Sequence, residues 1–424
     1  MYRLKTLSRT LLVLCLILGT LAMSSCNLLS FITGGIILPP QQSTEKPETN
    51  TPTGDIYVEG GDTNNITINP STSSGALAAS KAILSVVSIA AEFEKSSSSM
   101  LRPTTETFYQ YGSGVIYKLD KQKGEAYVIT NYHVIHSAND NSQTKIARKI
   151  SLFLYGMEFK DYAIKAEFVG GSMTYDLAVL KVTASPVIIS SLATAVTVAD
   201  SNNVSILETA IAIGNPDAEG ISATLGYVSV DSETISLLAS DEVTPIDIRV
   251  MRIDTAINSG NSGGGLFNDK GELIGIVNAK RTLSEGVGYA IPSNVAKYVA
   301  DNILYYCDGT PETQVQRMLL GVTVTSSDIY VVYDEESGKV LKRETVVVSD
   351  LTDTSAVKGI LEVGDVITSI KIGEAEYSIT RTFHLVDSML TARVGDTVEF
   401  NIVRDNTDKV VSIKLTAASL VKVE

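Results

Sequence analysis

A short glycine-rich run, DTAINSGNSGGGL at residues 254–266, has residue types and spacing suited to nucleophilic catalysis. It places one hydroxyl, that of Ser262, between glycines on both sides. Glycines let the backbone adopt positive φ and come close to a ligand. A nucleophilic serine needs such a turn, because backbone N–H groups must converge on the oxygen of the attacked carbonyl. The run predicts Ser262 as the nucleophile and the N–H groups of Gly260, Asn261 and Ser262 as oxyanion donors.

Two upstream motifs supply the other groups that a serine nucleophile requires. His133 lies in YVITNYHVI and Asp176 in YDLAVLKV. A catalytic triad needs a base and a group that orients the base. The order His, Asp, Ser is that of chymotrypsin and differs from the orders of subtilisin and the α/β-hydrolases. The sequence therefore predicts a serine protease in which Ser262 attacks, His133 transfers the proton and Asp176 orients the imidazole.

Five motifs together resemble one family. TNYHVI, YDLAVLKV, IAIGNP, GNSGGGL and GYAIPSN occur in the order seen in HtrA/DegP-type serine proteases, and the resemblance runs from about residue 77 to residue 415. It implies a mostly β protein, with a chymotrypsin-like double β-barrel protease domain followed by a PDZ domain. It also implies unfolded or misfolded polypeptides as substrates, a role in protein quality control, and homo-oligomers such as trimers, although nothing in the chain fixes their number. A proteolytically weak, peptide-binding or chaperone lipoprotein on the same scaffold remains the alternative.

The same resemblance locates the primary specificity pocket. Its base is expected about six residues before the nucleophile, at Ala256, and neighbouring Ile257 is also apolar. An apolar pocket favours apolar side chains but distinguishes poorly between similar ones. We therefore expect cleavage after Val, Ala, Ile or Leu, with Asp254 outside the pocket.

Composition limits the classes of function. The chain has 424 residues, enough for two or three domains, and a formal net charge of -14, which argues against nucleic acid as a partner. Its three cysteines are Cys15, Cys26 and Cys307. If the first is removed and the second modified, no internal disulfide can form. The histidines and cysteines lack any metal-ligand spacing, so no metal or other cofactor is predicted.

The N-terminal segment, residues 1–26, has the pattern of an export signal. Basic residues precede the apolar run LLVLCLILGTLAM, and Ser-Ser-Cys follows. Cys26 resembles the acylated cysteine of a bacterial lipobox, which predicts a lipoprotein. An uncleaved anchor is the alternative, because no charge occurs between Thr10 and Thr44. Either way, we expect an extracytoplasmic protein anchored to the bacterial cell membrane through its N-terminus.

The segment 27–76 is rich in Thr, Asn, Ser, Pro and Gly from about residue 39 onward. Such a composition buries too little apolar surface to offset the entropy of ordering, so a flexible tether is predicted.

The protease domain is predicted at residues 77–308, where short apolar strands alternate with turns. Strands are expected at 84–89, 113–117, 126–131, 150–155, 163–169, 177–182, 210–214, 226–230 and 248–253, followed by a hairpin that turns at 269–271. A helix should follow, with Ser293 as its N-cap and its end near Tyr306.

The PDZ domain is predicted at residues 318–420. Leu319, Leu320, Gly321 and Val322 resemble the carboxylate-binding loop of these domains, and residues 381–390 resemble the groove helix. The resemblance implies that peptide C-termini bind there by strand addition.

Two further histidines receive only secondary predictions. His136 is expected to be solvated, and His384, on the predicted groove helix, is a candidate peptide contact.

Overall fold

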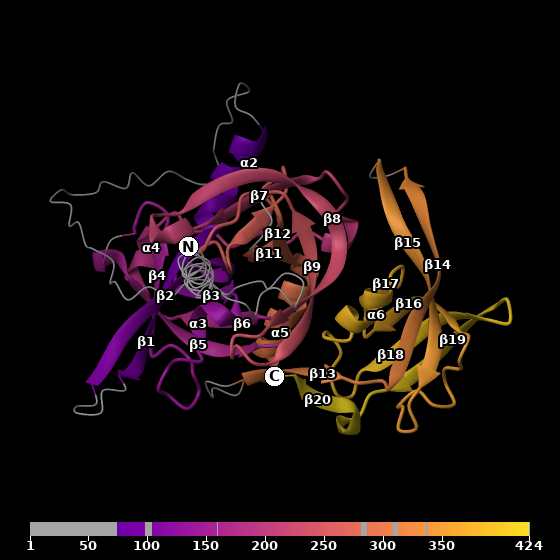
Figure 1. Ribbon diagram of the computed structural model, residues 1–424. Helices are drawn as coiled ribbons and strands as arrows, with labels where there is room; N and C mark the ends of the chain where they lie inside the picture. The colour runs from indigo at the N-terminus through magenta and orange to yellow at the C-terminus, as the bar shows by residue number, and fades with distance from the viewer. Residues whose placement is uncertain are drawn as a thin grey trace, which may run out of the picture.

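The computed structural model describes residues 74–97, 104–158, 160–280, 286–307, 313–335 and 338–423, which form two β-barrels followed by a third sheet (Figure 1). The predicted signal, Cys26 and most of the predicted tether lie outside these ranges. Within them, no helix combines the length and apolar character needed to cross a bilayer.

The first barrel is formed by six strands: β1 (Val86–Ser97), β2 (Thr104–Asp120), β3 (Glu125–Thr130), β4 (Lys149–Leu154), β5 (Ile164–Ser172) and β6 (Leu177–Val182). They pair in the order β5-β4-β1-β2-β3-β6, and β5 also pairs with β6, which closes the ring. Inward-facing side chains alternate with outward-facing ones along β4, as the period of a strand requires. Ile89, Phe93, Phe108 and Leu152 are among the buried residues at its centre.

The second barrel is closed by β7 (Thr209–Gly214), β8 (Ser222–Leu238), β9 (Pro245–Ile253), β10 (Gly265–Phe267), β11 (Leu273–Lys280) and β12 (Gly288–Pro292). The mostly β, double-barrel prediction is therefore confirmed. The strand at 177–182 has the predicted limits, whereas the strand expected at 226–230 extends over 222–238. The extension pairs with β9 through Leu238↔Pro245, and none of its residues is fully buried, so the apolar pattern did not reveal it.

Helices lie outside the barrels. They are α2 (Ser74–Ala82), α3 (Tyr132–Ile135), α4 (Pro186–Ser190) and α5 (Ser293–Tyr306), with 3-10 turns at Ile83–Ser85, Lys160–Tyr162, Ser201–Asn203, Pro216–Ala218 and Ala417–Ser419. The range predicted for α5 is confirmed, but the N-cap prediction is wrong. Pro292 is the N-cap, and the Ser293 hydroxyl donates to the Ala199 carbonyl at 2.7 Å. The chain passes directly from β12 into the helix, so Ser293 is already its first helical residue.

The C-terminal domain is a sheet of β14 (Val322–Asp334), β15 (Lys339–Leu351), β16 (Val366–Ile372), β18 (Thr397–Arg404) and β19 (Thr407–Lys414), with β17 (Ala375–Ser378) beside β16 and the helix α6 (Thr382–Ser388). These strands and this helix fit the pattern predicted for a PDZ domain. Phe400 and Ile370 are fully buried in its core.

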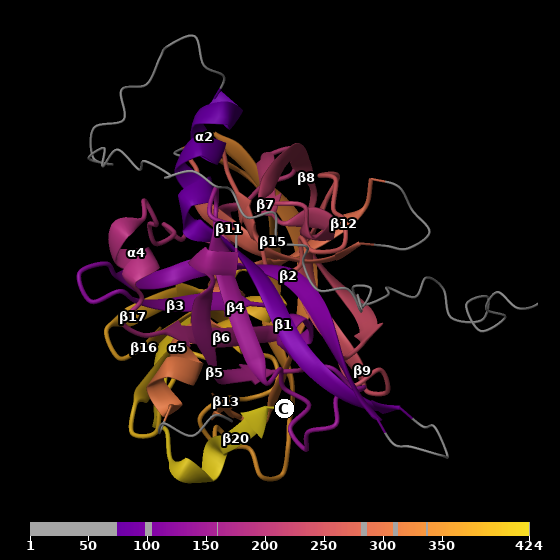
Figure 2. The same ribbon diagram turned by 90° about the vertical axis from the view of Figure 1, so that its left-hand side faces the viewer.

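The end of the chain returns to the first barrel. β20 (Leu420–Val423) pairs with β13 (Thr313–Met318), and β13 pairs in parallel with β5. The turned view places β13 and β20 below β5 (Figure 2). The C-terminal domain is thus joined to the protease fold at both of its ends.

Candidate active site

The three residues of the predicted triad lie where the two barrels meet. His133 is in α3, directly after β3, and Asp176 ends the turn that precedes β6. Ser262 lies in the connection between β9 and β10 of the second barrel. The first barrel therefore supplies the acid–base pair and the second supplies the nucleophile.

His133 and Asp176 form a close pair. The His133 Nδ1–H donates to Asp176 Oδ2 at 2.7 Å, and the His133 backbone N–H donates to Oδ1 at 3.0 Å. Asp176 has φ of 48°, an unusual value for a residue other than glycine, and its carbonyl accepts from Asn131 Nδ2 at 2.8 Å. These bonds fix the imidazole tautomer that leaves Nε2 free to accept a proton.

The Ser262 hydroxyl is engaged with its own barrel. It donates to the Asn278 backbone carbonyl at 2.9 Å, and the buried His133 Nε2 has no hydrogen-bond partner among the described residues. The structure thus contains the His–Asp bond of a triad but not the Ser–His bond. Such bonds are often absent until substrate binds.

Asn278, which the motif analysis missed, contacts both halves of the site. Its Nδ2 donates to Asp176 Oδ2 at 2.6 Å, while its carbonyl accepts from Ser262. It is buried near the end of the apolar strand β11. The only feature of the sequence that could have indicated Asn278 is its position as a polar residue near the end of an apolar strand.

The glycines around Ser262 are required by close packing between the barrels. A Cβ on Gly263, which has φ of 82°, would lie 2.2 Å from the Ser113 carbonyl oxygen. Ser113 in turn holds the serine loop, because its N–H donates to the Ser262 carbonyl at 2.8 Å and its hydroxyl to the Gly260 carbonyl at 2.7 Å. The tight turn thus positions the nucleophile against the first barrel.

The predicted oxyanion donors differ in availability. The Asn261 N–H donates to the Asn258 carbonyl at 3.1 Å. The N–H groups of Gly260 and Ser262 form no hydrogen bond within the described part of the chain. The backbone thus leaves two of the three predicted donors free to bind an oxyanion.

Two of the residues predicted at the specificity pocket, Ala256 and Ile257, are apolar. Ile257 is buried, and a Cβ on Gly288 would lie 2.8 Å from its side chain. Ala256 is exposed and its carbonyl accepts from Thr224 Oγ1 at 3.0 Å. Asp254 accepts from the Tyr227 N–H at 2.5 Å, so its carboxylate is directed to the backbone of β8.

His136 is not solvated, contrary to the prediction. It is buried, and its ring lies 5.1 Å from that of Tyr132. Burial lowers the pKa of its imidazole. His136 is the C-cap of α3, a single short turn that packs on the barrel, so neighbouring segments cover it.

The predicted carboxylate loop precedes β14. Leu319 is exposed, whereas Leu320 is buried in the domain core and its carbonyl accepts from Ser355 Oγ at 2.8 Å. Gly321 has φ of 69°, and Val322 begins β14, the edge strand of the sheet. Any contact made by Leu320 would therefore come from its backbone.

An ionic interface joins the second barrel to α6. Arg249 forms an ion pair with Asp387, whose side chain is 13% exposed, and the Arg249 Cζ atom lies 3.6 Å from the centroid of the Phe383 ring. Arg381 pairs with Asp231 at 3.0 Å. Burial raises the pKa of the Asp387 carboxyl.

His384 also lies in this interface. It is buried, and burial together with Arg249, Arg381 and Arg343 lowers its pKa to about 3. Its side chain therefore belongs to the contact between the domains, which argues against the predicted role as a peptide contact.

No group of three or more His, Cys, Asp or Glu side chains that could hold a metal ion occurs within the described ranges.

Comparison with known proteins gives a consistent result. Residues 112–276 match the model of the trypsin-like peptidase domain. The serine protease Do-like HtrA of Lactococcus lactis subsp. lactis is 33% identical over 320 residues, covering 73% of this chain and 71% of that protein. The serine protease Do-like HtrA of Bacillus subtilis is 32% identical over 348 residues, covering 79% of this chain and 70% of the relative.

Among solved structures, the HtrA-type protease AlgW with decapeptide is similar with a TM-score of 0.48 and 24% identity, covering 81% of this chain and 98% of that chain.

Proposed function

This chain belongs to the HtrA family of trypsin-like serine proteases and is a serine endopeptidase, and on that premise we propose that it is a membrane-tethered, extracytoplasmic enzyme that degrades unfolded proteins. The observation that carries the catalytic part of this proposal is the 2.7 Å bond between His133 and Asp176, beside a serine on a glycine turn.

The proposed mechanism assigns one role to each residue. Ser262 Oγ attacks the peptide carbonyl, while His133 Nε2 takes its proton and then gives it to the leaving amine. Asp176 stabilises the imidazolium that forms. The N–H groups of Gly260 and Ser262 bind the oxyanion, and the loss of one such donor typically costs about 3–4 kcal/mol of barrier.

The first step requires a change in one hydrogen bond. In the resting site the Ser262 hydroxyl donates to the Asn278 carbonyl. For proton transfer it must turn to His133 Nε2, which is unpartnered among the described residues.

Ser262→Ala provides the direct test of this mechanism. We expect it to abolish casein cleavage and fluorophosphonate labelling while leaving the melting temperature nearly unchanged. Unlabelled wild-type protein would instead favour a binding protein on a protease scaffold. Undiminished cleavage by the alanine variant would exclude Ser262 as the nucleophile.

The apolar surroundings of the pocket support cleavage after Val, Ala, Ile or Leu. Ile257 and the exposed Ala256 offer no charge to a substrate side chain, and the Asp254 carboxylate is already bonded to backbone. Sequencing the termini of fragments from a denatured protein tests this specificity. Cleavage mainly after Lys and Arg would show that Asp254 forms the floor of the pocket.

For the C-terminal domain we propose a PDZ-type site that binds peptide C-termini. The carbonyls of Leu320 and Gly321 accept from residues of the 352–356 turn, which holds the loop in place. The N–H groups of the same two residues form no hydrogen bond within the described ranges, and we propose that they bind the terminal carboxylate. β14 is the edge strand to which a peptide would add. Peptides with a free apolar C-terminus should bind the full-length protein, and the matching amides should bind much more weakly.

The location and assembly of the protein complete the proposal. Acylation of Cys26, or an uncleaved apolar segment, would hold it on the outer side of the cell membrane, and the family resemblance favours a homo-oligomer. Mass spectrometry of the mature N-terminus distinguishes a diacylglyceryl cysteine from an intact Met1.

A further inference from the structure

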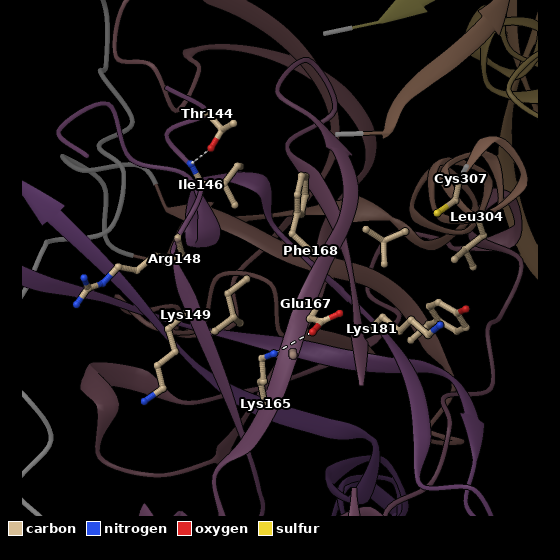
Figure 3. Close-up of a pocket in the computed structure, with 15 residues that line it drawn as sticks. Thr144, Ile146, Arg148, Lys149, Lys165, Glu167, Phe168, Lys181, Leu304 and Cys307 are labelled. Carbon is tan, nitrogen blue, oxygen red and sulfur yellow. Dashed lines mark hydrogen bonds and ion pairs between the residues drawn. The ribbon is translucent and has the colours of Figure 1, made fainter. Parts of the chain in front are cut away.

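An open cavity of about 940 Å³ lies on the first barrel and contains none of the proposed catalytic residues (Figure 3). It is lined by β3 to β6 and by the C-terminal end of α5. Its volume falls in the range of sites that bind ligands.

The floor of this cavity is apolar. Ala147, Ile150, Ala166 and Val169 are buried beneath it. The half-buried side chains of Ile146, Phe168 and Leu304 also line it and remain in reach of solvent. An apolar surface of this kind favours an occupant with aliphatic or aromatic side chains.

The rim is cationic in a chain whose formal net charge is -14. Arg148 and Lys165 are paired with glutamates, the latter with Glu167 at 2.9 Å. Lys149 and Lys181 also line the cavity, and neither forms an ion pair within the described part of the chain. Figure 3 places Lys149 near one side of the cavity and Lys181, with Leu304 and Cys307, near the other. Two lysines without an ion pair in the described ranges therefore flank an apolar floor, and the Lys181 ammonium also lies 5.9 Å from the centroid of the Tyr127 ring.

One segment of the chain outside the described ranges has the complementary pattern. Residues 55–59, Asp-Ile-Tyr-Val-Glu, place three apolar side chains between two acids. Between residues 41 and 73 the other large apolar residues are Ile66 and Ile68, which lack flanking acids. The pattern matches the cavity in both polarity and charge.

We infer that residues 55–59 dock in this cavity, with Ile56, Tyr57 and Val58 on the apolar floor and the two carboxylates beside Lys149 and Lys181. Five extended residues span about 17 Å. The 15 steps from Glu59 to Ser74, where the described chain begins, can span at most about 54 Å. Weak contacts suffice, because a short linker keeps the segment at millimolar effective concentration.

Docking would shorten the free part of the tether. Only residues 27–54 would then separate the protease from the membrane, and this consequence alone rests on the proposed anchoring. The docking itself involves residues of the barrel and the segment and is independent of catalysis.

Cys307 lines the cavity and provides a way to test docking by disulfide trapping. The full-length chain in detergent would carry Ser262→Ala, Cys15→Ser and Cys26→Ser, so that Cys307 is the one native thiol. Val58→Cys should form an intramolecular disulfide about tenfold faster than either Thr51→Cys or Thr67→Cys. These controls lie on either side of the segment, so chain statistics alone would give Val58→Cys no such advantage.

Charge reversal sharpens the test. Lys149→Glu with Lys181→Glu should reduce trapping of Val58→Cys to the control rate, and adding Asp55→Lys with Glu59→Lys should restore it. Thermal melts check that each variant is folded. Equal rates at all three cysteines, or trapping that ignores charge reversal, would overturn the inference, as would disulfides that form only between molecules. The trapping experiment is done in the Ser262→Ala background and does not depend on catalysis. A negative trapping result would therefore leave the proposed catalytic mechanism untouched.

Discussion

The seam between the two barrels and the interface between the second barrel and α6 are held together by different forces. The seam is built from short hydrogen bonds to backbone groups, such as those from Ser113 to the carbonyls of Ser262 and Gly260, and from glycines that permit close approach. The α6 interface is built from ion pairs, Arg249–Asp387 and Arg381–Asp231.

The difference follows from what each contact must do. Hydrogen bonds to fixed backbone atoms set positions within narrow limits, and displacing a catalytic group by about 1 Å can cost about a hundredfold in rate. Ion pairs tolerate more movement, and their strength depends on pH and burial. Changes in the seam should therefore reduce activity, and changes in the α6 interface should mainly reduce stability.

Asp176→Asn should give the largest effect on the seam. An asparagine retains the shape of the residue but favours the wrong imidazole tautomer, so kcat should fall by about 10⁴ while the melting temperature changes little. Rates of peptide hydrolysis and thermal melts measure the two effects. A loss of less than tenfold would show that Asp176 does not orient His133.

Arg249→Met should give the largest effect on the α6 interface. It leaves the mostly covered Asp387 carboxylate, which is 13% exposed, without its partner, and the free energy of unfolding should fall by about 3–5 kcal/mol. Because Arg249 is not among the proposed catalytic residues, hydrolysis of a short peptide should continue at close to the original rate.

The matched control for Arg249→Met removes both charges. Arg249→Met with Asp387→Leu should recover most of the lost stability in urea unfolding, since no unpaired charge remains buried. If the single and double variants were equally unstable, packing rather than charge would account for the interface.

Asn278→Ala tests the residue that connects the two halves of the seam. It removes a hydrogen bond to the Asp176 carboxylate, typically worth about 1.5–3 kcal/mol, so kcat/KM should fall by about 10- to 100-fold. If Asn278 positions Asp176, the variant should also shift the acid limb of the pH–rate profile. If Asn278 has only a structural role, the variant should lower the stability alone. Asn278→Gln should recover less than the original rate, because its amide reaches further.

His384 should give the smallest effect, and one that depends on pH. Its pKa is lowered to about 3 in the folded chain, so the unfolded chain binds more protons between pH 6.5 and 3. Its contribution to stability is therefore present above about pH 6.5 and lost as the pH falls. Between pH 6.5 and 5 the free energy of unfolding in urea should fall in both proteins. The fall should be smaller in His384→Gln than in the original chain by on the order of 1–2 kcal/mol. If the free energy of unfolding depended on pH equally in the two proteins, this account would be contradicted.

The pattern of apolar residues predicted a mostly β chain and the position of several strands, the ordered motifs predicted a serine endopeptidase, and the family resemblance implied the double barrel. The parts that followed from the residues alone depend on local patterns: glycines around a serine, a histidine after an apolar strand, and short apolar runs such as 177–182. A local pattern restricts the backbone wherever the rest of the chain lies, so it can be recognised without the fold.

Other features were decided only when distant segments came together. Asn278 lies 102 residues from Asp176, and Arg249 lies 138 residues from Asp387, yet each pair is in contact. The burial of His136, the direction of the Ser262 hydroxyl and the return of β20 to the first barrel also depend on such packing. A hydrogen bond or a buried charge depends on which atoms surround a group in space, and spacing along the chain carries little of that information.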